Sequence, residues 1–189
     1  MDGLVEYNVS DLVAQLRTIA SKTTDPSVII ERMRAPARRL ASAKHWIEPG
    51  FYQCDPVQGF GAHLLHEEPD HSLAVMVLAW LPSRGVPPHD HGTWAVVTGI
   101  EGPETNIFWT RRDDGSRPEY CDIVERERQV VSAGAQVTLL PDEIHSVVNE
   151  SDKVTLSLHI YGRHINHTAR SQYCPITQVR RPLVVTMQH

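Results

Sequence analysis

The chain has 189 residues, of which 41% are hydrophobic and 22% charged, with a formal net charge of -5. These values are typical of a globular protein with one core, and the acidic balance argues against a nucleic-acid partner. No apolar run reaches membrane-spanning length, and the N-terminal sequence MDGLVEYNVS lacks the basic start and apolar core of a secretory signal. Three cysteines without CxxC spacing, Cys54, Cys121 and Cys174, indicate reduced thiols and predict a cytoplasmic location.

The first 48 residues predict helices. Ser10 is placed to cap a helix over residues 11–20, whose apolar side chains fall on one stripe. A second helix is expected to start at Asp25-Pro26, because proline suits the first helical turn. Pro36 is expected to interrupt it, leaving a short third helix to about Lys44. These helices are expected to cover one end of a sheet.

From residue 50 onward the pattern changes to short strands separated by turns rich in glycine, proline and aspartate. Strands are expected at residues 63–66, 72–80, 93–98, 106–110, 120–124, 129–131, 135–140, 147–148 and 154–161. Many short strands at regular spacing are typical of an antiparallel barrel or a double-sheet jelly roll. The prediction is one domain over residues 1–189, with N-terminal helices over about 1–48 and a mainly β barrel over about 50–189.

The most informative motif is His89-Asp90-His91. On an extended segment, residues two apart point to the same side, so the two imidazoles face together and Asp90 points away. Asp90 is therefore expected to have a loop or supporting role. A third imidazole from another strand, His145, can complete a three-nitrogen site for a divalent metal with positions left for substrate.

The region from Gly85 to Asn149 resembles the cupins, whose barrels carry a glycine-bounded HxH motif and a second G…P…H…N motif. The resemblance implies a cupin barrel that brings His145 beside the HxH pair. Many cupins have a glutamate four or five residues after HxH, where this chain has Ala95 and Val96. Three neutral imidazoles would leave the full +2 charge on the metal and favour an anionic ligand, notably a thiolate. The alternative is a degenerate cupin that binds no metal.

A second pattern lies at residues 155–162. Ser157, His159 and Tyr161 share one face of the expected strand, and each can both donate and accept a hydrogen bond. Facing a cavity, they would have to bond to one another to offset the cost of burial. The alternative is a polar strand edge that faces solvent.

The segments PHDHGTW (residues 88–94) and SLHIYG (residues 157–162) resemble those of the thiol dioxygenases of the cysteine dioxygenase superfamily, especially 3-mercaptopropionate dioxygenases. These cupins use non-haem Fe(II) to add both atoms of O2 to a thiol sulfur, giving a sulfinate. The resemblance implies that His89, His91 and His145 bind iron. It also implies that Ser157, His159 and Tyr161 form a relay beside it, acting on a small thiol carboxylate.

The residues expected to bind the substrate match the thiol dioxygenases less completely than the metal motifs do. The resemblance implies that Arg170 binds the substrate carboxylate, with Arg163 as a weaker candidate and a surface arginine as the alternative. Where related enzymes carry arginine or glutamine before the metal motif, this chain has Ala62. At the position that forms a cysteine–tyrosine cross-link in animal enzymes it has Ala95, so Tyr161 cannot be cross-linked there.

Two other functions are compatible with the sequence. One is a different metal-dependent cupin enzyme, such as a dioxygenase that cleaves carbon–carbon bonds or an isomerase. The other is a cupin that binds a ligand without turnover. The sequence leaves open which thiol is used and the oligomeric state. It assigns no specific role to five further histidines, which are expected at the surface or beside the site: His63, His66, His71, His164 and His167.

Overall fold

The computed structural model describes residues 6–188; residues 1–5, which belong to the N-terminal segment considered above, and residue 189 lie outside the described residues. The helical elements are α1 (Val9–Ala20), α2 (Pro26–Ser42), η1 (Lys44–Trp46), η2 (Pro49–Tyr52) and η3 (Ile165–His167). The strands are β1 (Phe60–Glu67), β2 (Ala74–Trp80), β3 (Gly85–His89), β4 (Ala95–Glu101), β5 (Glu104–Arg111), β6 (Ile123–Val131), β7 (Gln136–Leu139), β8 (Ile144–Val148), β9 (Thr155–Tyr161), β10 (Ser171–Cys174) and β11 (Val179–Pro182). Within residues 6–188, no helix combines the length and apolar character needed to cross a membrane.

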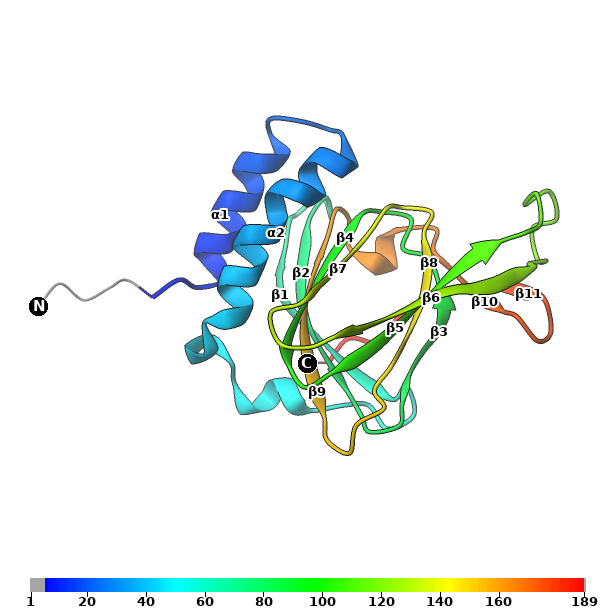
Figure 1. Ribbon diagram of the computed structural model, residues 1–189. Helices are drawn as coiled ribbons and strands as arrows, with labels where there is room; N and C mark the ends of the chain where they lie inside the picture. Colours follow the sequence, from blue (N-terminus) through cyan, green and yellow to red (C-terminus); the bar gives the residue numbers. More distant parts are fainter. Residues whose placement is uncertain (1–5, 189) are drawn as a thin grey trace, which may run out of the picture.

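The strands form two antiparallel sheets. Their orders are β1-β2-β9-β4-β7 and β11-β10-β3-β8-β5-β6. Helices α1 and α2 cover the outer face of the first sheet, and the second sheet lies on the far side of the barrel (Figure 1). The predicted mainly β, double-sheet barrel with an N-terminal helical cap is therefore confirmed.

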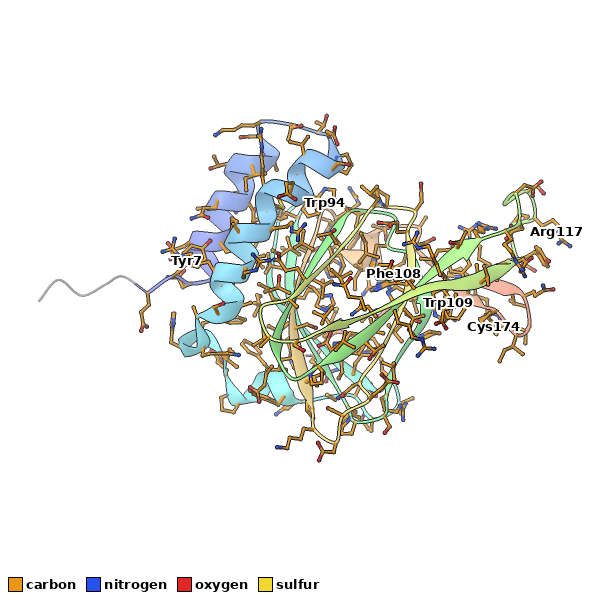
Figure 2. All side chains as sticks on the ribbon, in the orientation of Figure 1. Tyr7, Trp94, Phe108, Trp109, Arg117 and Cys174 are labelled. Atoms are coloured by element: carbon orange, nitrogen blue, oxygen red, sulfur yellow. The ribbon has the colours of Figure 1, made fainter. Side chains whose placement is uncertain are left out.

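Strand β9 is buried on both faces because it separates two cores. Leu156, Leu158 and Ile160 pack toward the helices, whereas Tyr161 belongs to the core inside the barrel. Figure 2 shows Phe108 between the sheets and Arg117 at the tip of the long β5–β6 hairpin, far from the helices. The polar face of β9 thus points into the barrel and not to solvent.

Two predictions about the helices were wrong. The cap of α1 is Asn8, whose side chain accepts the N–H of Asp11 and forms a reciprocal capping box with it; Ser10 lies inside the first turn and donates to Asn8. Pro36 does not end α2, which continues to Ser42. Proline removes one backbone hydrogen bond, but the buried side chains of α2 pack against the barrel and hold the helix together.

The strand predictions were mostly right in position, with three differences. Residues 123–131 form one strand, not two, because the exposed charged residues 125–128 pair with β5 at the sheet edge. Strand β3 was not predicted, since Pro87 and Pro88 have no N–H to donate; its pairing with β8 shifts register between Val86 and His89. The short strands β10 and β11 were also not predicted.

Candidate metal centre and its cavity

Three buried histidines meet at one end of the barrel. His89 is the last residue of β3 and lies directly opposite His145 of β8, and His91 follows in the loop before β4. One ring nitrogen from each lies within 4.8 Å of the others, and each side chain is at most 3% exposed. The structure thus brings together the three predicted metal ligands.

The hydrogen bonds of these rings leave nitrogen lone pairs for a metal. Nδ1 of His145 donates to Oδ1 of Asn106 at 3.0 Å, so Nε2 carries the lone pair, and this buried Nε2 has no protein partner. Nδ1 of His89 likewise donates to the carbonyl of Pro87 at 2.9 Å. Nδ1 of His91 is buried without a partner. A buried nitrogen without a partner costs folding free energy, and a divalent ion bound to these nitrogens would offset that cost. The arrangement therefore fits a bound divalent ion.

Electrostatics keep the three rings neutral. Burial, together with the positive charge of Arg170, lowers the pKa of His145 to about 3. Burial also lowers the pKa of His89 and of His91 well below the usual value, helped by the neighbouring imidazoles. Neutral imidazole is the form that binds a metal, so no proton has to be displaced near neutral pH.

The predicted hydrogen-bond chain on β9 is present. Nδ1 of His159 lies 2.8 Å from the hydroxyl of Tyr161, and its Nε2 lies 2.9 Å from Oγ of Ser157. The indole N–H of Trp80 donates to the same Oγ at 3.2 Å, and an indole can only donate. The Ser157 hydroxyl hydrogen is then left for His159, which donates onward to Tyr161, so that Tyr161 can donate into the cavity.

Glu104, at the start of β5, was not identified from the sequence. It is 1% exposed, its Oε1 accepts from Thr155 at 3.5 Å, and its Oε2 has no hydrogen-bond partner. Burial raises its pKa to about 8, although the side chains of Ser157, Thr155 and Trp80 oppose the rise. A protonated Glu104 is a weaker hydrogen-bond acceptor than a carboxylate, so its neutral form favours donation from the Ser157 hydroxyl to His159.

The positions that depart from the family pattern are apolar in the structure. Ala95 lies directly opposite Tyr161 in the β4–β9 pairing, so the residue facing the tyrosine has neither thiol nor carboxylate. Ala62 is fully buried in β1, opposite Leu78 of β2. Neither position offers a charged group to the site.

Arg170 reaches the same cavity from the residue before β10. It is 4% exposed and its Nε has no hydrogen-bond partner. Because Gln172 of β10 pairs with His89 of β3, the segment that carries Arg170 runs beside the metal motif. Arg163, the weaker candidate, is exposed and donates to the carbonyl of His167. Of the two, only Arg170 lines the cavity.

Asp90 holds this segment in place. Its carboxylate accepts the backbone N–H of Ser171 at 2.8 Å and the hydroxyl of Tyr173, while its own N–H donates to the carbonyl of Ser171. This agrees with the supporting role expected from its position between the two histidines. The strand that bears the metal motif is therefore joined directly to the segment that bears Arg170.

One cavity joins these groups. Its free volume is about 20 Å³, room for about one water molecule. Its lining residues are Phe60, Leu78, Trp80, Val86, His89, His91, His145, Val147, His159, Tyr161, Ile165, Arg170 and Val185. Among these described residues there is no carboxylate, so the polar groups are neutral imidazoles, a phenol, an indole and one cationic guanidinium.

No protein-family model matches the chain. Distantly similar solved structures include oxalate oxidase in complex with the substrate analogue glycolate, with 17% identity and a TM-score of 0.44 over 56% of this chain and 52% of that chain. An uncharacterized conserved protein with a double-stranded β-helix domain from Klebsiella pneumoniae has 12% identity and a TM-score of 0.46 over 68% and 96%. KdgF from Halomonas sp. has 13% identity and a TM-score of 0.43 over 59% and 84%. The chain therefore spans about half the length of the oxalate oxidase, 52%.

Proposed function

We propose that this chain is an Fe(II)-dependent thiol dioxygenase that converts a small thiol carboxylate into a sulfinate. The observation that carries the proposal is the composition of one cavity. Three neutral histidines, a tyrosine at the end of a buried hydrogen-bond chain and an unpaired arginine line it together, with no carboxylate among the described lining residues.

Charge supports the choice of substrate. A divalent ion on three neutral imidazoles keeps its full charge, and the guanidinium of Arg170 adds another positive charge in the same cavity. The surrounding walls are apolar, which strengthens attraction between charges. A substrate with two negative groups, a thiolate and a carboxylate, compensates both centres. Arg170 suits the carboxylate because its planar fork can donate two parallel hydrogen bonds.

In the overall reaction, R–SH and O2 give R–SO2⁻ and H⁺: two S–O bonds form, the O–O bond breaks and the thiol proton is released. Bound Fe(II) would supply the redox chemistry that activates O2 and would favour the thiolate form of the substrate. Arg170 fixes the carboxylate and so orients the sulfur. Tyr161, held by His159 and Ser157, donates a hydrogen bond to the reacting end of the substrate.

The cavity limits the size of the substrate. With about 20 Å³ free, even a three-carbon thiol carboxylate requires wall side chains to move. Val185 is the wall residue from the C-terminal segment, and that segment is held by hydrogen bonds between Asn166 and the backbone of Val185. Small, unbranched thiols are therefore preferred. The cytoplasmic location and the absence of nucleic-acid partners stay predictions.

The test is metal-free protein loaded anaerobically with Fe(II) and assayed with an oxygen electrode against 3-mercaptopropionate, cysteine, mercaptosuccinate and cysteamine. The proposal expects oxygen uptake with at least one thiol carboxylate and a much weaker response to cysteamine, which has no carboxylate. The Tyr161→Phe variant should keep its iron and lose about 10- to 100-fold in rate. Oxygen uptake with none of these thiols would contradict the proposal.

A further inference from the structure

A second group of metal-binding side chains lies away from the cavity. Glu67 ends β1, His71 lies in the β1–β2 turn, and His164 and His167 flank η3, which follows β9. One ligand atom from each of Glu67, His164 and His167 lies within 4.8 Å of the other two. We propose that these three residues bind a divalent transition-metal ion at a second site, separate from His89, His91 and His145.

The backbone holds the group together. The N–H of His164 donates to the carbonyl of His71 at 3.0 Å, which joins the β1–β2 turn to the segment after β9. His164 is 5% exposed, whereas His167 is open to solvent, so an ion could enter from the surface. Two of the three ligands are therefore positioned by one short helical turn and the third by the end of a neighbouring strand.

His71 supports the carboxylate and one imidazole. Its Nδ1 bonds to Oε1 of Glu67, and its ring stacks on that of His167 with centroids 3.5 Å apart and planes within 9°. A carboxylate has two oxygens, so Glu67 can bond to His71 with one and to a metal with the other. Hydrogen-bonded support of this kind is common around metal ligands and orients them before the ion arrives.

The donor set selects the class of ion. Two imidazoles and one carboxylate suit zinc and other first-row transition ions, whereas magnesium and calcium prefer sites made of oxygen alone. The donor set is therefore suited to a zinc-like ion.

Metal binding would leave a local signature. Nδ1 of His164 accepts the backbone N–H of Asn166 at 3.2 Å. If the ion binds Nδ1, it replaces this N–H; if it binds Nε2, the ring proton moves to Nδ1, which can then no longer accept. In both cases the amide of Asn166 loses its acceptor, which changes its NMR chemical shift.

An ion bound at this second site would hold in place the segment that leads to the cavity. Residues 162–170 connect Tyr161, at the end of the relay, to Arg170. An ion shared by Glu67, His164 and His167 would tie this segment to the β1–β2 turn and favour the folded form by mass action. We infer that the ion has a structural role here, because it crosslinks two segments that are distant in sequence.

The experiment is equilibrium dialysis of the metal-free full chain against buffered Zn(II), with bound zinc counted by mass spectrometry. The Glu67→Gln and His167→Ala variants should each bind one zinc fewer per chain than the native protein. His66→Ala is the matched control, because His66 precedes Glu67 in β1 but bonds to Glu68 and lies outside the group, so this variant should bind as many ions as the native chain. Circular dichroism checks that each variant is folded.

The comparison does not depend on the first site. The two groups share no residue, so the expected loss of one zinc holds whether or not His89, His91 and His145 also bind zinc. Zinc should also shift the Asn166 amide signal in the native chain and leave it in place in His167→Ala. Equal zinc counts in the native, Glu67→Gln and His167→Ala chains, or an Asn166 signal that zinc does not move, would overturn the proposal.

Discussion

The carboxylate of Asp90 accepts the backbone N–H of Ser171 at 2.8 Å, which links the metal motif to the residue that follows Arg170. The same carboxylate bonds to the hydroxyl of Tyr173. Asp90 is thus a positioning residue: it holds the guanidinium at a fixed place relative to the histidines on either side of it. In the proposed function, Asp90 thereby fixes the position of the carboxylate-binding guanidinium relative to the metal ligands.

Replacing Asp90 should therefore weaken substrate binding more than metal binding. In Asp90→Ala the N–H of Ser171 and the hydroxyl of Tyr173 lose their acceptor, and we expect KM to rise about 10-fold. Asp90→Asn keeps one acceptor oxygen and should recover part of the loss. Steady-state kinetics and iron content measure the two effects. An equal loss of iron in Asp90→Ala would show that Asp90 acts through the histidines instead.

The buried charge of Arg170 should lower the free energy of unfolding, although the same side chain is proposed to bind the substrate carboxylate. It is buried with an unpartnered Nε, so Arg170→Met should raise the free energy of unfolding by about 1–3 kcal/mol, because an uncompensated buried charge is removed. The same change should weaken binding of thiol carboxylates about 10- to 100-fold and leave cysteamine unaffected. Urea unfolding and KM values for the two kinds of thiol test this. A destabilised variant with unchanged selectivity would be evidence against the assignment.

Glu104 should make stability fall as pH rises. Its pKa is raised from 4.5 to about 8 in the folded chain, so the native state holds a proton that the unfolded state releases between these values. The buried histidines have lowered pKa values and act in the opposite direction, but only below their usual value of 6.5. Between pH 6.5 and about pH 8, Glu104 is therefore expected to dominate.

The matched variant is Glu104→Gln, which keeps the shape and cannot ionise. Between about pH 6.5 and pH 8 the native protein should lose about 2 kcal/mol of unfolding free energy relative to the variant. Urea titrations of both proteins at the two pH values measure the difference. Parallel pH dependence in the two chains would show that Glu104 is already ionised in the folded state.

Asn106 should control metal affinity. It accepts the Nδ1 proton of His145 and so presents Nε2 to the metal. Asn106→Ala should lower metal affinity about 10- to 100-fold, measured by competition with a chelator. Ser146→Ala is the control, because Ser146 neighbours His145 in β8 but bonds to Trp109, and its affinity should match the native chain. Equal affinities in all three proteins would count against this orienting role.

The sequence predicts the parts of the site that follow a short-range pattern. His89 and His91 reach the cavity together as expected, although His91 lies in the loop after β3. The alternation of Ser157, His159 and Tyr161 reflects the period of two in a strand, and the structure buries all three in β9, where they bond to one another. Glu104 and Asn106 obey the same period in β5, together with the buried Phe108, so alternation was the signal that could have identified them. Sequence spacing alone could not predict which side chains Glu104 and Asn106 would contact on other strands.

Other features depended on long-range packing. The role of Asp90 requires the β3–β10 pairing, and β10 has too few residues for its pattern to be recognised. Helix α2 continues through Pro36 because its buried face packs against the barrel, which outweighs the local preference to stop. The grouping of Glu67 with His164 and His167 likewise joins segments about a hundred residues apart, whose proximity only the folded sheets create.

The central claim is that both atoms of O2 are added to the sulfur of a thiol carboxylate in the cavity formed by His89, His91, His145, Tyr161 and Arg170. The most direct measurement is turnover of the iron-loaded chain under ¹⁸O2 with 3-mercaptopropionate or cysteine, followed by mass spectrometry of the product. The account predicts a sulfinate in which both oxygens carry the label, formed at one O2 consumed per thiol, and no product from His145→Ala. An unlabelled or singly labelled product, or a disulfide as the only product, would contradict it.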